Sequence, residues 1–223
     1  MSKIKHQILQ PPAIKILKSQ LPQKVIDQIN DHIDQVSIPK NIDHSQGLVG
    51  QINRDNKSAQ ITFDFDYSET TKNFQYMLND IGTEFLKNAY RKESKVEAFE
   101  GWSIHSYEGD YNPLHDHGVN TDGGFSCIIY LKVPDQIKEL PEPSTASLTK
   151  ASGTEDGMTN FHWGHTSLKD FSHLREPTSF TQKPTEGTML LFPNWLAHSV
   201  NPFFGEGERR TFSANFNIYD YGV

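Results

Sequence analysis

A chain of 223 residues with a net charge of −7 and a pI near 5.8 is large enough to form one domain with a substantial core. The acidic balance argues against general nucleic-acid binding, because no basic field would attract a phosphate backbone. The single cysteine, Cys127, rules out an intramolecular disulfide, and the chain has neither an apolar start typical of a signal peptide nor an apolar run near the roughly 20 residues of a membrane span, so we expect a soluble, cytoplasmic protein.

The first part of the chain predicts helices. Residues 12–18 alternate like a short strand, and residues 21–36 then place apolar side chains at helical spacing. A second amphipathic helix is expected at about residues 70–91, with Ser68 or Thr70 as its N-cap.

From residue 96 onward the sequence changes to short apolar or alternating runs, each typical of a strand. Residues 135–157 are rich in Pro, Ser, Thr, Glu and Gly and predict a long loop, which in a compact domain is often functional. Helices followed by about eight short strands predict an α+β, mainly β, fold: a double-stranded β-helix (jelly roll) with N-terminal helices buttressing one sheet. We expect residues 1–223 to form a single domain, with 1–95 as helix-rich support and 96–220 as the jelly-roll core.

Three histidines have the spacing of a metal site built on strands. On a strand, residues i and i+2 point to the same face, so His115 and His117 can reach one metal while Asp116 points away. His198, which follows the predicted strand 188–193, would supply the third ligand. Isolated histidines are usually surface or packing residues, but these three lie near strand ends. Three ligands on one face leave positions open for a cosubstrate and oxygen, as non-heme Fe(II) oxygenases require.

The strand that begins at Arg209 carries a second signal. With period two, Arg209 and Thr211 share a polar face with three more polar residues. The opposite face starts with Arg210 and is apolar after it. A polar row turned into a barrel needs partners, because each unmet buried donor costs about 1–3 kcal/mol. A dicarboxylate would satisfy it through the Arg209 guanidinium and the Thr211 hydroxyl. Alternatively, Arg209 and Arg210 only solvate the strand start, and a bulge would exchange their faces.

The segments that carry these signals are Gly109–His117, Ser126–Pro134, Gly187–Val200 and Glu208–Asn215. They resemble the 2-oxoglutarate/Fe(II)-dependent oxygenases related to prolyl hydroxylases, most closely a subgroup frequent in marine bacteria and their phages. The resemblance covers roughly residues 95–220. It implies that His115, His117 and His198 are the catalytic metal ligands and that Arg209 anchors 2-oxoglutarate. The wider superfamily has Asp or Glu at the position of His117, and Asp116 is the alternative ligand if the strand is irregular.

By this resemblance the protein is a dioxygenase that uses Fe(II), 2-oxoglutarate and O2 to hydroxylate a C–H bond. The favoured substrate is a peptidyl or free amino-acid side chain held under the 135–157 loop, and a phage-encoded copy would act in the host cytoplasm. Two alternatives remain open. A cupin-like metalloenzyme without 2-oxoglutarate would tolerate Arg209→Ala, and a non-catalytic jelly-roll binding module would bind no metal tightly.

Overall fold

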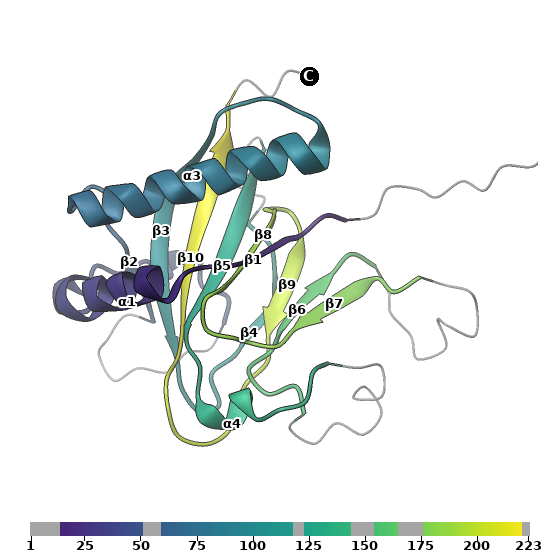
Figure 1. Cartoon of the computed structure of the whole chain (residues 1–223). Coiled ribbons are helices and arrows are strands. Elements are labelled where there is room, and N and C mark those ends of the chain that lie inside the picture. The colour runs from purple at the N-terminus through teal and green to yellow at the C-terminus, as the bar shows by residue number, and fades with distance from the viewer. Residues whose placement is uncertain (1–13, 51–58, 118–122, 144–153, 165–175, 220–223) are drawn as a thin grey trace, which may run out of the picture.

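Two antiparallel sheets form the body of the protein in the computed structural model, which describes residues 14–50, 59–117, 123–143, 154–164 and 176–219 (Figure 1). The major sheet has the strand order β1–β8–β5–β10–β3–β2, and the minor sheet has the order β4–β9–β6–β7. The strands are β1 Leu17–Gln20, β2 Gln60–Thr62, β3 Val96–Ser106, β4 Asn112–His115, β5 Gly124–Lys132, β6 Thr159–His162, β7 Ser179–Gln182, β8 Thr188–Pro193, β9 Ala197–Val200 and β10 Arg209–Ile218.

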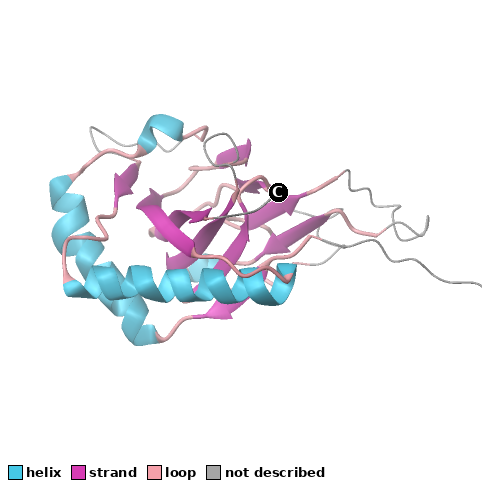
Figure 2. Ribbon diagram, turned by 90° about the horizontal axis from the view of Figure 1, so that it is seen from above, coloured by secondary structure: helices cyan, strands magenta, loops and turns pink. Residues whose placement is uncertain are grey.

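The two longest helices, α1 and α3, lie on one face of the major sheet and cross its strands (Figures 1 and 2). Helix α3 starts with a capping box: the Ser68 hydroxyl accepts the Thr71 amide, and the Thr71 hydroxyl accepts the Ser68 amide. None of the described helices is long and apolar enough to span a membrane. The helical segments are α1 Gln23–His32, the π-helical turn η1 Ile33–Ser37, α2 Ile38–Lys40, the 3-10 turn η2 Ser45–Gly47, α3 Glu69–Tyr90 and α4 Asp135–Lys138.

Strand β10 separates two buried apolar clusters. Its residues Phe212, Ala214 and Phe216 face the helices and belong to the outer cluster, which also contains residues of α1 and α3. The inner cluster lies between the sheets, with Tyr130 and Phe161 among its members. The opposite face of β10 therefore points toward the space between the sheets, and this alternation is what positions the candidate site.

The predicted fold class, a jelly roll with helices against one sheet, is confirmed, and β3 to β10 follow residue 95 as expected. Several boundaries differ. The first described strand is Leu17–Gln20, so it begins later than the predicted 12–18, and residues 1–13 lie outside the described part. The helix predicted to end at residue 36 becomes a π-helical turn after residue 32. The predicted loop 135–157 begins with helix α4, and its segment 144–153 is outside the described residues.

Candidate metal and cosubstrate site

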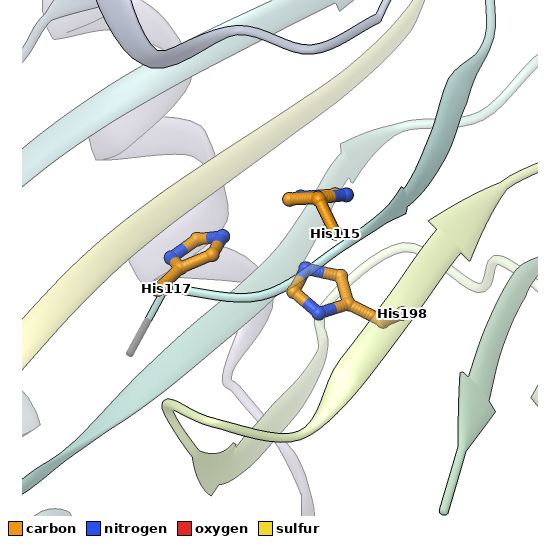
Figure 3. Close-up of side chains that lie close together, drawn as sticks. All are labelled: His115, His117 and His198. Atoms are coloured by element: carbon orange, nitrogen blue, oxygen red, sulfur yellow. The ribbon is translucent and has the colours of Figure 1, made fainter. Parts of the chain in front are cut away.

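The three predicted histidines come together at the mouth between the two sheets. His115 is the last residue of β4, and its Cα pairs with that of His198 on β9. His117 follows two residues beyond the strand end. Ligand nitrogens of the three residues all lie within 4.8 Å of one another, and Figure 3 shows the rings gathered around one point. Asp116 is exposed and is not a member of this group.

Hydrogen bonds at Nδ1 orient the rings of His115 and His198. His115 Nδ1 lies 2.8 Å from the carbonyl oxygen of Pro113, and His198 Nδ1 lies 3.0 Å from that of Leu196. A carbonyl oxygen can only accept, so each Nδ1 carries the proton and donates it. The lone pair of each neutral imidazole is therefore on Nε2, which is the usual arrangement of histidines that bind a metal.

Burial favours the neutral form of His198 and His115. The side chain of His198 is only 3% exposed, and burial followed by the charges of His115 and His117 lowers its pKa well below the ordinary value. Burial also lowers the pKa of His115. Neutral imidazoles are available to a metal at neutral pH and suit Fe(II). Because the three bring no negative charge, a divalent ion among them would favour an anionic chelating ligand.

Arg209 is a buried cation beside the histidines. It is 2% exposed and lines a narrow cavity together with Thr211, His115 and His198. Its Nε donates to the carbonyl oxygen of Gly157 at 2.9 Å. Burial lowers the pKa of the guanidinium, yet arginine stays charged in proteins.

Among the described residues, every group that hydrogen-bonds to Arg209 is neutral. Its Nη2 donates to Oγ1 of Thr159 at 3.2 Å, and the Tyr130 hydroxyl donates to the same oxygen at 2.8 Å. The guanidinium carbon lies 5.4 Å from the Tyr130 ring centroid. Gly157 adopts φ +67°, a left-handed conformation that favours glycine, and it turns its carbonyl toward Arg209. A buried cation fixed by neutral groups is a strong candidate for binding an anion.

Arg210 faces the other layer. Its guanidinium donates to Glu208 at 3.0 Å and to Asp34 at 2.6 Å, so it is a structural ion-pair residue. The predicted alternation therefore holds, with Arg209 and Thr211 toward the cavity. The ladder between β10 and β5 does shift after Arg210, but the skipped residue, Leu131, belongs to β5. The faces of β10 are unchanged.

A wider groove of about 730 Å³ adjoins the cavity at His115 and His117, which line both. His44, Glu100, Trp102 and Asn112 line it, together with His115 and His117. No local pattern in the sequence marks Asn112 or Glu100, so neither residue is predicted from the sequence alone. Their relevance follows from the sheet registers that bring β3 and β4 to the groove.

A family model described as "Putative 2OG-Fe(II) oxygenase" matches residues 100–215, a span that contains the three histidines and Arg209. No curated protein sequence matches the chain significantly. Among solved structures, a prolyl-4-hydroxylase from Pseudomonas putida is similar (10% identity, TM-score 0.56, 91% of this chain and 92% of that chain).

Two ligand-bound structures share the fold. HygX from Streptomyces hygroscopicus with nickel and 2-oxoglutarate bound has 12% identity and a TM-score of 0.56, over 93% of this chain and 84% of that chain. The viral collagen prolyl hydroxylase from Paramecium Bursaria Chlorella virus-1, as its 2OG complex, has 18% identity and a TM-score of 0.50, over 90% and 94%. The chain therefore belongs to the 2-oxoglutarate/Fe(II)-dependent oxygenase family and is an enzyme that uses Fe(II) and 2-oxoglutarate.

Proposed function

We propose that Nε2 of His115, His117 and His198 binds Fe(II), that Arg209 and Thr211 bind 2-oxoglutarate, and that the enzyme hydroxylates a C–H bond of a peptidyl or free amino-acid side chain. The observation that carries this proposal is the meeting of three imidazoles beside a buried guanidinium whose described partners are neutral. When bound, Fe(II) and 2-oxoglutarate supply oxidative chemistry in which O2 is consumed and 2-oxoglutarate becomes succinate and CO2.

The protein's own residues position and shield the reactants. Arg209 would hold the carboxylate of 2-oxoglutarate farthest from the keto acid, and the Thr211 hydroxyl, on the same face of β10, would donate a second hydrogen bond. The rings of Phe161 and Phe192 pack against His198, with centroids 5.9 and 5.0 Å from its ring. These apolar contacts keep water away from the buried side of the histidine cluster.

The groove offers the route for the substrate. It reaches the exposed side of His115 and His117, opposite the inner apolar cluster, and its volume of about 730 Å³ accommodates an amino-acid side chain with its flanking backbone. Two proteins of similar fold are named as prolyl hydroxylases, which supports a peptidyl substrate here. The predicted cover, residues 135–157, includes a segment outside the described residues, so its role stays a prediction.

Anaerobic titration of the Fe(II)-loaded protein with 2-oxoglutarate tests the proposal. We expect a visible charge-transfer band in the wild type and in His162→Ala, whose imidazole lies on β6 outside the cluster. The band should be absent in His198→Ala. Iron binding without a band in the wild type would contradict 2-oxoglutarate chelation at this site, and a band that survives in His198→Ala would contradict the ligand set.

A further inference from the structure

The three clustered histidines differ in what holds Nδ1. For His115 and His198 the partner is a backbone carbonyl oxygen. For His117 it is a side chain: Nδ1 lies 2.9 Å from Oδ1 of Asn215, and the Ser126 hydroxyl is 3.2 Å from the same nitrogen. His117 also lies beyond the end of β4, where its backbone amide donates to the carbonyl oxygen of Asn194 at 2.8 Å, and the hydrogen bonds of its ring go to side chains. Its orientation therefore depends on neighbouring side chains.

Asn215 sits in the middle of a row across three strands. In the registers of the major sheet it pairs with Glu100 on β3 and with Ser126 on β5. Its Nδ2 donates to Oε1 of Glu100 at 2.6 Å, and the Ser126 hydroxyl donates to its Oδ1 at 2.7 Å. All three side chains lie on the face of the sheet that His117 meets.

This row determines which nitrogen of His117 carries the proton. The Glu100 carboxylate can only accept, so it fixes the amide of Asn215 with Nδ2 toward itself and Oδ1 toward the histidine. An amide oxygen also only accepts, so Nδ1 of His117 must donate. The lone pair of His117 is then on Nε2, as in the other two histidines.

The same row brings negative charge toward a ligand set that has none. Glu100 is joined to His117 by two successive hydrogen bonds through Asn215. Hydrogen bonds in a chain polarise one another, so the carboxylate makes Oδ1 a stronger acceptor and the imidazole a stronger electron donor. Glu100 Oε2 also lies 3.9 Å from Nε2 of His44, on the groove side.

We propose that Asn215 and Glu100 are positioning residues for His117. Asn215 holds the ring with Nε2 toward the metal. Glu100 holds Asn215 in place, and its negative charge polarises the amide. The proposal rests on the proposed Fe(II) site and deepens it. It requires the charge of Glu100 to strengthen binding of a metal that Glu100 does not itself contact.

Co(II) binding, monitored by visible absorption, distinguishes the positioning of His117 by Asn215 from the effect of the charge on Glu100. Asn215→Ala removes the acceptor at Nδ1, and we expect the Kd for Co(II) to rise about 10- to 100-fold. In Glu100→Gln the new side chain still accepts the amide of Asn215 but is uncharged. We expect the Kd to rise about 3- to 10-fold and the Co(II) bands to shift. Glu97→Gln is the matched control, because Glu97 is also on β3 but pairs with Lys95 at 3.1 Å.

The tautomer of His117 is a readout that a purely structural role would not change. In nitrogen-15 NMR of the metal-free protein we expect protonated Nδ1 for all three clustered histidines of the wild type. In Asn215→Ala only His117 should become a mixture of tautomers. Thermal unfolding curves check that each variant is folded, and Glu100→Gln decides the question if Asn215→Ala does not fold.

Two failures are distinguishable. Wild-type Co(II) affinity and spectrum in folded Asn215→Ala and Glu100→Gln would overturn the positioning role while leaving the metal site intact. A wild-type protein that binds no Co(II), or Co(II) binding that survives in His198→Ala, would overturn the proposed site itself, and the positioning role with it.

Discussion

The Cα atoms of His115 and His198 pair across the β4–β9 ladder, and their ring centroids lie 4.2 Å apart. Side chains that are directly opposite in an antiparallel pair lie next to each other, and an irregularity in β4 between Asn112 and His115 sets this register. Backbone register alone therefore sets two of the three proposed ligands. For the third, His117, the backbone amide donates to the carbonyl oxygen of Asn194 at 2.8 Å, and side chains orient the ring.

Replacement of Arg209 should weaken 2-oxoglutarate binding, whereas replacement of Arg210 should lower the stability of the fold. In Arg209→Ala we expect 2-oxoglutarate to bind at least about 100-fold more weakly, because a charge-assisted hydrogen bond contributes roughly 1.5–3 kcal/mol and a bidentate grip contains two. In Arg210→Ala we expect unchanged 2-oxoglutarate affinity but a loss of stability of about 1.5–3 kcal/mol, because Glu208 and Asp34 lose charge-assisted hydrogen bonds from Arg210 and keep only those from His105 and Lys132. Calorimetric titration and denaturant unfolding measure the two effects, and the reverse pattern would show that Arg210 is the anchor.

Thr211→Val tests the hydroxyl beside the anchor. Thr211 is buried and lines the cavity with Arg209, and valine keeps its shape. Loss of one neutral hydrogen bond of about 0.5–1.5 kcal/mol predicts a rise of roughly 2- to 12-fold in the Kd for 2-oxoglutarate. Affinity for Co(II) alone should not change. An unchanged Kd for 2-oxoglutarate would remove Thr211 from the proposed site.

Metal binding should stabilise the fold through His115. At a free Ni(II) concentration of 100 times Kd, binding to the native state alone adds about 2.7 kcal/mol to the free energy of unfolding. We expect this gain in the wild type and none in His115→Ala. Urea unfolding with and without Ni(II) measures it, and an equal gain in both proteins would place the bound ion elsewhere.

Acid should weaken the ion-pair network at the start of β10. Burial alone would raise the pKa of Glu208, but hydrogen bonds from His105 and Arg210 outweigh it and lower that pKa to about 2. A lowered pKa means that the charged form contributes stability above about pH 4.5, which is lost as the pH falls toward 2. At pH 7 we expect Glu208→Gln to cost on the order of 3 kcal/mol in unfolding free energy.

The difference between Glu208→Gln and wild type should shrink as the pH falls from about 4.5 to 2. Glu206→Gln, an exposed position in the same hairpin, is the control and should match the wild type at every pH. A difference for Glu208→Gln that does not depend on pH would show that its charge contributes nothing to stability.

Sequence periodicity predicted the parts of the fold whose local pattern is strong. Helix α3 and its Ser68 cap have clear periodic and capping signals. The faces of β10 were predicted correctly because its alternation is unbroken; the irregularities lie on its partners, where Leu131 of β5 and Phe99 of β3 are skipped. The gathering of His115, His117 and His198 was also anticipated, although the strand argument covers only His115, because His117 lies past the strand end.

Other features depend on tertiary contacts that no local pattern encodes. His198 lies on β9, a four-residue strand predicted only as a segment after 188–193. Gly157 and Thr159, which hold Arg209, come from a distant part of the chain. The division of the chain at residue 95, the ligand roles of the site residues, the substrate class and a phage origin stay predictions.

One face of β10 packs in the outer core, and the other lines the cavity beside the three histidines. A slip of one residue along this strand would move the guanidinium of Arg209 into the helical layer and the ring of Phe212 into the cosubstrate cavity. The misaligned chain would lose its proposed anchor and its outer core together. Insertions within β10 should therefore be far less tolerated than insertions in the hairpin before it.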